Sequence, residues 1–159
     1  MKTAVIFGVS GQDGAFLSRL LLEKKYRVIG VCRNTGNACL NNLDRLNIKH
    51  RIELVASSIG CFEHVKRIIR EYKPDEIYNL AGQSSVSHSF KNPVETFEGI
   101  SIGTLNLLEA VRTLNLPVKL YNAGSGDCFG NIKDRAAIED TPFNPTSPYG
   151  VAKASAFWQ

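Results

Sequence analysis

The hydrophobic positions of this chain follow two alternating patterns. Short continuous apolar runs, such as the β-branched stretch from Thr3 to Gly8, are typical of buried parallel strands. Between them, apolar residues recur every three or four positions, as on one face of a helix. The expected strands lie at 3–8, 27–32, 51–56, 76–82 and 118–126. This β-α-β alternation predicts an α/β fold with a doubly wound parallel sheet of the Rossmann type.

The helical segments each carry an apolar stripe that is expected to cover the sheet. In the first segment the polar side is basic, with Arg19, Lys24 and Lys25 opposite the stripe. The predicted stripes comprise Phe16, Leu17, Leu20 and Leu21 in the first helix, Phe62, Val65, Ile69 and Tyr72 in a second, and Leu105, Leu108 and Val111 in a third.

Composition narrows the class of protein. The chain has 159 residues, of which 43% are hydrophobic and 21% charged, which fits one globular domain. The net charge of +4 is spread along the chain without runs of like charge. This balance does not favour nucleic acid as a partner, and it suits an anionic small ligand.

Cysteine spacing and hydropathy indicate a soluble cytoplasmic protein without a metal site. The four cysteines, at positions 32, 39, 61 and 128, show no paired framework, so free thiols are expected. No leader precedes the first strand, and no apolar run approaches the ~20 residues of a membrane span. The three histidines, His50, His64 and His88, lack metal-ligand spacing.

A glycine-rich stretch links the first strand to the first helix. Gly8, Gly11 and Gly14 form the pattern G-x-x-G-x-x-G, with Gln12 and Asp13 between the last two glycines. In this strand–turn–helix context, glycines let the backbone approach a pyrophosphate at the helix N-terminus. The stretch therefore predicts dinucleotide binding, and the alternative is an ordinary tight turn.

The residue after the second strand bears on the choice between NAD and NADP. An NAD site usually offers a carboxylate there to the ribose hydroxyls, whereas an arginine accommodates the 2′-phosphate of NADP. This chain has Arg33, and its next carboxylate is Asp44. We therefore predict NADP, with a solvated loop charge as the alternative role for Arg33.

Three later features of the chain are also candidate parts of a ligand-binding site. "NLAG" follows the fourth strand, Ser125 follows the fifth, and Tyr149 and Lys153 stand four residues apart in a helix that "SP" at 147–148 begins. A tyrosine and a lysine at this spacing would be unremarkable alone. Their combination with the other features is much more specific, although a partly buried helix aromatic remains the alternative for Tyr149.

Together these features resemble the extended short-chain dehydrogenase/reductase family, in its nucleotide-sugar 4,6-dehydratase branch, and most of all the GDP-mannose 4,6-dehydratases. The similarity runs through "GQDGAFLSRLLLEKKYRVIGVCR", "PDEIYNLAGQSSVSHSF", "GTLNLLEAVR" and "TPFNPTSPYGVAKASAFW". It implies NADP as cofactor and a nucleotide sugar, GDP-mannose, as substrate. The implied catalytic residues are Ser125, Asp127, Tyr149 and Lys153, and the implied cofactor-binding residues are Gly8, Gly11, Gln12, Asp13, Gly14, Arg33, Ser58, Leu80, Ala81, Gly82, Ser84, Tyr149 and Lys153.

The residue types agree with that chemistry. Tyrosine, with an unperturbed pKa of about 10, is a poor base at neutral pH, and a neighbouring ammonium stabilises the phenolate form. Tyr149 with Lys153 can then take a proton from a sugar hydroxyl that Ser125 also holds. The resemblance implies oxidation at C4, loss of water across C5 and C6, and return of the hydride to C6. Elimination needs a further acid/base group, which we assign to Asp127, with a turn residue as the alternative.

Three positions depart from the family pattern. Ser58 stands where the family generally has an aspartate that holds the adenine, which predicts weaker adenine binding. Ser125, Gly126 and Asp127 replace threonine, a polar residue and glutamate, so the carboxylate reaches less far. Ser84 fits the serine of the loop after the fourth strand, whereas Ser85 replaces a histidine often found there.

The family members are considerably longer than this chain. We therefore expect residues 1–159 to be an NADP-binding Rossmann-type domain without the C-terminal substrate domain, and a complete small domain is the alternative. Such a chain is expected to form a homo-oligomer through helix faces that include Leu105, Leu108 and Val111, to bind NADP weakly and not to turn over GDP-mannose. A non-catalytic dinucleotide-binding module and a nucleotide-sugar epimerase or 4-keto reductase remain alternative functions.

Overall fold

The computed structural model describes residues 1–36, 40–132 and 136–159, so the predicted free thiol of Cys39 lies outside the described residues. The strands are β1 (Thr3–Phe7), β2 (Arg27–Cys32), β3 (Glu53–Ala56), β4 (Glu76–Asn79) and β5 (Lys119–Asn122). The helices are α1 (Gln12–Glu23), α2 (Asn41–Arg45), α3 (Phe62–Tyr72), α4 (Val86–Lys91), α5 (Pro93–Phe97), α6 (Gly103–Leu114) and α7 (Pro148–Trp158), with the 3-10 turns η2 (Lys49–Arg51) and η4 (Gly126–Phe129) and the π-helical turn η3 (Glu98–Ile102).

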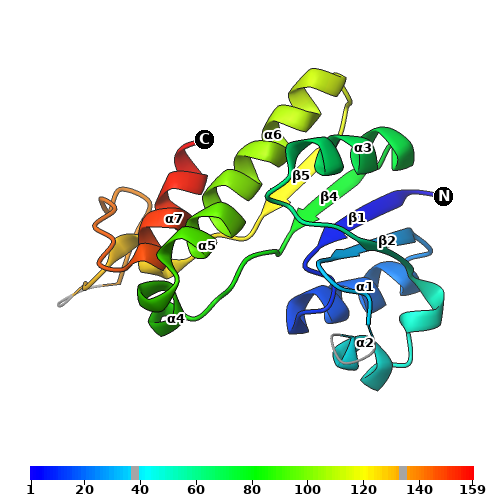
Figure 1. Ribbon diagram of the computed structural model, residues 1–159, viewed down its shortest axis with the longest axis horizontal. Helices are drawn as coiled ribbons and strands as arrows, with labels where there is room; N and C mark the ends of the chain where they lie inside the picture. Colours follow the sequence, from blue (N-terminus) through cyan, green and yellow to red (C-terminus); the bar gives the residue numbers. More distant parts are fainter. Residues whose placement is uncertain (37–39, 133–135) are drawn as a thin grey trace. The chain divides into compact units, whose positions relative to one another are not determined.

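The five strands form one parallel sheet in the order β3-β2-β1-β4-β5 (Figure 1). β1 lies at the centre, where Val5 aligns with Ile29 of β2 on one side and with Ile77 of β4 on the other. The chain therefore builds outward from β1 to β3, returns to the middle, and builds outward again to β5. This arrangement confirms the doubly wound parallel sheet that the sequence predicted.

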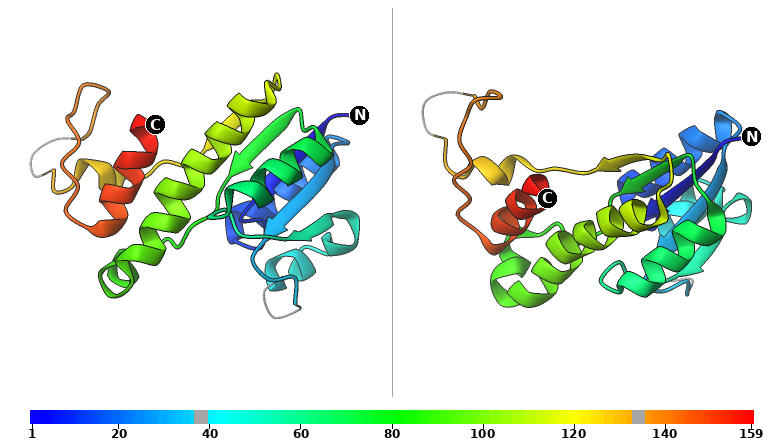
Figure 2. Two further views of the ribbon diagram at one scale, coloured as in Figure 1. Left: turned by 45° about the horizontal axis from the view of Figure 1, so that its top comes forward. Right: turned by 90° about the horizontal axis from the view of Figure 1, so that it is seen from above.

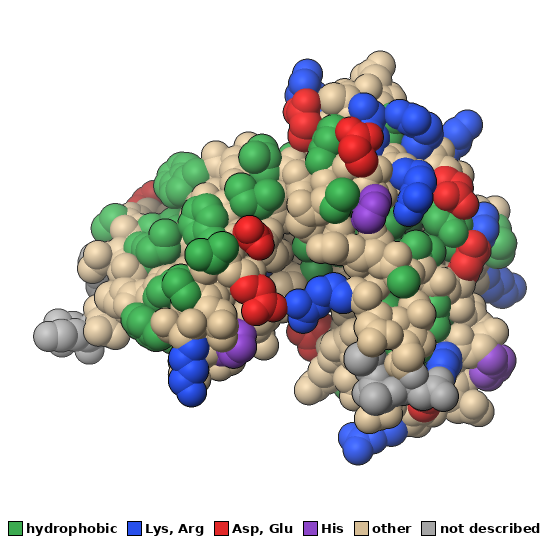
Figure 3. All heavy atoms as spheres, viewed as in Figure 1, with side chains coloured by type: hydrophobic (Ala, Val, Ile, Leu, Met, Phe, Trp, Pro, Cys, Tyr) green, Lys and Arg blue, Asp and Glu red, His purple; other side chains and the backbone are tan. Residues whose placement is uncertain are grey.

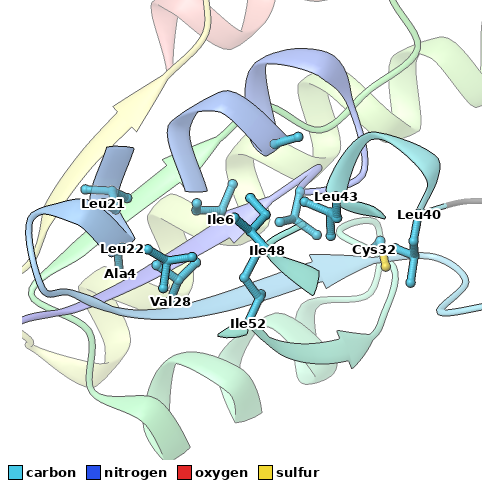
Figure 4. Close-up of a cluster of buried hydrophobic side chains, with 12 residues drawn as sticks. Ala4, Ile6, Leu21, Leu22, Val28, Cys32, Leu40, Leu43, Ile48 and Ile52 are labelled. Carbon is cyan, nitrogen blue, oxygen red and sulfur yellow. The ribbon is translucent and has the colours of Figure 1, made fainter. Parts of the chain in front are cut away.

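Helices cover both faces of the sheet, α1 and α2 on one face and α3 and α6 on the other (Figures 1 and 2). Alternate strand residues enter opposite cores, because successive side chains of a strand point to opposite faces. Ile6 packs with Leu21, Leu22 and Leu43 in the first core, which Figure 4 shows. The other core contains Val5, Phe7, Ile29, Val65, Ile68, Ile69, Ile77, Leu107 and Ala110.

The buried faces of two helices differ from the predicted stripes. In α1, Phe16 and Leu20 are exposed, whereas Ser18 and Leu22 are buried together with Leu21. Ser18 is tolerated there because its hydroxyl donates to the carbonyl of Gly14, at 2.6 Å. In α6, Leu105 is exposed and the core-facing residues are Leu107 and Ala110. Both helices have apolar residues at neighbouring positions, so the sequence allowed more than one face of each helix to be buried. The way each helix packs on the sheet determines which of these faces is buried.

The described chain separates into two compact units. The first contains 1–81 and 106–123, which include the whole sheet, and the second contains 82–105 and 124–159. In the second unit, Ile100 packs with Tyr149, Ala152 and Ala156 in a small core of its own. A polar contact joins η3 to α7 there, because the hydroxyls of Ser101 and Ser155 lie 2.8 Å apart.

The sequence predicted neither disulfide bonds nor membrane-spanning helices. Within 1–36, 40–132 and 136–159, Cys32, Cys61 and Cys128 are free thiols, as predicted. No helix in this part of the chain has both the length and the apolar character needed to cross a membrane.

Candidate active site

The carboxyl ends of β1 and β4 define a natural ligand-binding position in the first unit. These strands are neighbours, yet the chain leaves them toward opposite sides of the sheet. In open α/β sheets, ligands bind outside the carboxyl ends at such a switch point. The glycine-rich turn after β1 and residues Leu80 and Ala81 after β4 lie at this edge, where the Leu80 amide donates to the Phe7 carbonyl at 2.9 Å.

Two glycines of the turn are required by its geometry. Gly8 has a φ of +86°, a backbone conformation that side chains disfavour, and a Cβ there would lie 2.6 Å from the carbonyl oxygen of Leu80. A Cβ on Gly14 would lie 2.7 Å from the Cα of Val9. The turn can therefore pack against both β4 and α1 only with glycine at these positions.

The N-terminus of α1 fits a dinucleotide pyrophosphate. Gly11 is the N-cap and offers no side-chain cap, and the amide of Ala15 donates to the carbonyl of Gly11 at 3.0 Å. The amides of Gln12, Asp13 and Gly14 come before that point, where an α-helix provides no carbonyl partners. Such N–H groups, together with the helix dipole, attract phosphate oxygens. The residues present thus fit the phosphate part of the cofactor.

A residue that the sequence did not single out holds this turn in place. The side-chain amide of Asn42, in α2, donates to the carbonyl of Ser10 at 2.9 Å. The turn is therefore fixed on one side by the sheet and on the other by α2. No local pattern marks Asn42, because its role depends on the spatial approach of α2 to the turn.

The other residues assigned to the cofactor in the first unit follow the outer strands. Arg33 comes directly after β2 and is exposed, and Ser58 lies two residues after β3 and is also exposed. The amide of Ser57 donates to the carbonyl of Cys32 at 2.9 Å, so the two strand ends are joined. Arg33 and Ser58 therefore lie at the same edge of the sheet as the glycine turn.

The predicted catalytic residues all belong to the second unit. The Ser147 hydroxyl caps α7 by accepting from the amide of Gly150 at 3.0 Å, and Pro148 occupies the first turn. Tyr149 is buried, with 8% of its surface exposed. Lys153 follows one turn later, and its Nζ lies 5.9 Å from the centre of the Tyr149 ring. The expected tyrosine–lysine pair is therefore on one face of α7.

Lys153 is held in a poorly hydrated environment. Burial lowers the pKa of its ammonium below the usual value, and the thiol of Cys128 opposes this shift. Burial in turn raises the pKa of the Cys128 thiol. A charge that is shielded from water acts more strongly on its neighbours. Cys128 was not among the residues predicted for the site, and the sequence gives no signal beyond its place next to Asp127.

The short turn η4 brings Ser125 and Asp127 beside the start of α7. The Ser125 hydroxyl donates to Oδ2 of Asp127 at 2.9 Å and accepts from the Asp127 amide at 3.2 Å. A Cβ on Gly150 would lie 2.7 Å from the carbonyl oxygen of Asp127, so glycine at this position permits close packing of α7 on η4. A hydroxyl, a carboxylate, a phenol and an ammonium are thus contributed by two packed elements.

Gly82 and Ser84 lie in the second unit, whereas Leu80 and Ala81 belong to the first. Ser84 is exposed, and its neighbour Gln83 donates to the hydroxyl of Thr96 at 2.8 Å. In the described ranges, no group of three or more His, Cys, Asp or Glu side chains is arranged to hold a metal ion.

Comparison with known proteins places these features in a family. The chain is 40% identical to the GDP-mannose 4,6-dehydratase of Vibrio cholerae and 38% identical to that of Homo sapiens, over 99% of its length in each case. It spans 44% of each relative, which is less than half of their length.

A solved structure with the same fold is the dTDP-glucose 4,6-dehydratase of Streptomyces venezuelae, which has NAD bound. Its TM-score is 0.84 at 25% sequence identity, over 97% of this chain and 48% of that one. The family model described as GDP-mannose 4,6 dehydratase matches residues 5–159. By the glycine turn, the tyrosine–lysine helix and this match over nearly all of its length, the chain belongs to the GDP-mannose 4,6-dehydratase family.

Proposed function

We propose that this chain binds NADP and supplies the catalytic side chains for dehydration of a nucleotide sugar, GDP-mannose, to its 4-keto-6-deoxy form. The observation that carries this proposal is the packing of η4 on α7, which gathers Ser125, Asp127, Tyr149 and Lys153 in one unit. The names of the relatives support the substrate.

Each side chain has a distinct task in this reaction. The Lys153 ammonium stabilises the phenolate form of Tyr149, and this phenolate takes the proton of the 4-hydroxyl and becomes a neutral phenol. When the sugar binds, the single proton of the Ser125 hydroxyl, which points to Asp127 in this structure, turns to the same sugar oxygen. A nicotinamide bound at this site would supply the hydride chemistry for the oxidation and the final reduction of the sugar.

Asp127 serves the elimination step. The proton at C5 becomes acidic once C4 is a ketone, and its removal must accompany departure of the 6-hydroxyl. The Asp127 carboxylate is exposed, and before the sugar binds it accepts a hydrogen bond from the Ser125 hydroxyl, which holds it beside that residue. A carboxylate at this point favours a dehydratase over an epimerase or a 4-keto reductase, because those reactions require no elimination.

The proposed roles of Tyr149 and Asp127 can be tested separately in a chimaera. In this protein, the remaining part of the Vibrio cholerae relative is joined to the end of the present chain. Tyr149→Phe should lower turnover by about 10²–10⁴-fold, because the base for oxidation is lost. Asp127→Asn should accumulate a 4-keto sugar that retains its 6-hydroxyl, since oxidation does not need the carboxylate. Mass spectrometry of incubated GDP-mannose distinguishes the products.

Tyr121→Phe and Asp140→Asn are the matched controls, because both residues are exposed and lie outside the site. They should behave like the parent. If Asp127→Asn also completes the dehydration at the parental rate, Asp127 is only a turn residue.

NADP is favoured over NAD because Arg33 follows β2 and can contact a 2′-phosphate. The Streptomyces venezuelae dehydratase has NAD bound, so the proposed preference for NADP rests on Arg33 and not on that structure. In calorimetric titrations, Arg33→Ala should weaken NADP binding by about 10–100-fold and leave NAD binding nearly unchanged, because the contact is charge-assisted.

Arg51→Ala removes the same charge from an exposed position before β3 and should change neither affinity. Equal or tighter binding of NAD by the parent chain would remove the argument for NADP.

The partner of the second unit is proposed to be a second copy of the chain. Exposed apolar side chains gather on this unit (Figure 3). They include Val94, Phe97, Leu105, Val151 and Phe157, and contiguous apolar patches are uncommon on monomers. A two-fold axis would pair the same face of two copies, which is the usual arrangement of homodimers.

Leu105→Glu should shift the chain toward monomer in analytical ultracentrifugation, with a dimer Kd raised by about tenfold or more, because a charge would be buried at the contact. Leu20→Glu is the control, since Leu20 is 48% exposed and Leu105 45%, on helices of equal length. A monomeric parent chain, or the same shift in both variants, would contradict a dimer through this face.

A further inference from the structure

The loop after β4 carries a glutamine whose side chain is engaged at both ends. Oε1 of Gln83 accepts from the amide of Ser85 at 2.8 Å, and Nε2 donates to the hydroxyl of Thr96 at 2.8 Å. Thr96 is fully buried in α5, and its hydroxyl donates in turn to the carbonyl of Asn92 at 2.8 Å. Gln83 thus fastens its own loop to the interior of the second unit.

These hydrogen bonds restrain the backbone on both sides of Ser84. The bond from the Ser85 amide to the Gln83 side chain closes a short ring around Ser84. Ser85 is also the N-cap of α4, where its hydroxyl accepts from the amide of His88 at 3.2 Å. Ser84 itself is exposed. It is therefore an exposed residue in a segment that is held before and after it.

The same loop is connected to the tyrosine of the candidate active site. Val86, the first residue of α4, packs on the small core that contains Tyr149. The proposed oxidation transfers a hydride from the sugar carbon whose hydroxyl Tyr149 deprotonates, so the nicotinamide ring must lie next to that carbon. The nicotinamide half of the cofactor therefore belongs with residues of the second unit, which include Ser84.

We propose that Gln83 is a positioning residue, which holds Ser84 in place for a hydrogen bond to the nicotinamide half of NADP. The inference rests on the proposed binding of NADP. An unrestrained loop would have to be ordered when the cofactor binds, and the entropy lost in that step would weaken binding. The two hydrogen bonds of the Gln83 side chain order the loop before the cofactor binds.

Two ligands separate this role from a general contribution to folding, because 2′-phospho-ADP-ribose is NADP without its nicotinamide. In calorimetric titrations of the 159-residue chain, Gln83→Met should weaken NADP binding by about 3–10-fold, since methionine has a similar length but no amide group. The Kd of 2′-phospho-ADP-ribose should not change, because its phosphates and adenosine are proposed to bind at the first unit. Thr96→Val should give the same pattern, and the double variant should show no further loss, because both changes remove one connection.

Two further variants serve as controls. Gln83→Glu should bind NADP as the parent chain does, because a carboxylate can accept both from the Ser85 amide and from the Thr96 hydroxyl once that hydroxyl turns toward it. Thr104→Val is the matched control for Thr96→Val, since Thr104 is also buried and donates to the carbonyl four residues earlier, at 2.7 Å. It should change neither Kd.

The inference alone is overturned if the parent chain binds NADP and Gln83→Met binds it equally well, or if Gln83→Met weakens both ligands to the same extent. It is also overturned if Gln83→Glu binds as weakly as Gln83→Met, or if Thr104→Val has the effect of Thr96→Val. Absence of NADP binding by the parent chain would overturn the proposed cofactor as well.

Discussion

The central strand β1, buried between two apolar cores, fixes the position of the glycine turn and of the first amide groups of α1. A helix cannot satisfy its own first N–H groups, and here the N-cap is a glycine, which has no side chain to accept from them. The preceding turn reaches that point only because Gly8 adopts a left-handed conformation against the Leu80 backbone. Because β1 pairs with β4, it holds the glycine turn beside Leu80. An anion is the natural partner of such a helix end. The strand ends beside it carry Arg33 and Ser58, which are the residues that we propose to contact the rest of the nucleotide.

Close packing also fixes the candidate catalytic residues of the second unit. Gly150 lets η4 approach α7 closely, which places the Ser125–Asp127 pair near the turn that carries Tyr149. Burial of Lys153 lowers the pKa of its ammonium, so the charge is less stable there than in water. The same shielding strengthens its interaction with an anionic phenolate. The proposed reaction thus offers a reason for a lysine at a position where burial disfavours its charge.

Much of this architecture could be predicted from the sequence. The uninterrupted apolar runs located all five strands, and their alternation with helices gave the parallel, doubly wound sheet. The G-x-x-G-x-x-G pattern and the tyrosine–lysine spacing located the two sets of candidate residues, because both are short-range patterns with a direct physical meaning. What local patterns could not give was the orientation of helices with several apolar residues in succession, as Phe16 and Leu20 of α1 illustrate. Asn42 and Cys128 were missed for a related reason, since their roles arise from contacts with distant or buried groups.

The central claim is that a dinucleotide binds with its phosphates at the N-terminus of α1. The most direct measurement is a titration of the ¹⁵N-labelled chain with NADP, followed by amide resonances. The account predicts that the largest shifts occur at Gly11, Gln12, Asp13 and Gly14, with further shifts at Arg33 and Ser58. Saturable binding whose largest shifts lie away from the glycine turn, or a spectrum that NADP leaves unchanged, would contradict it.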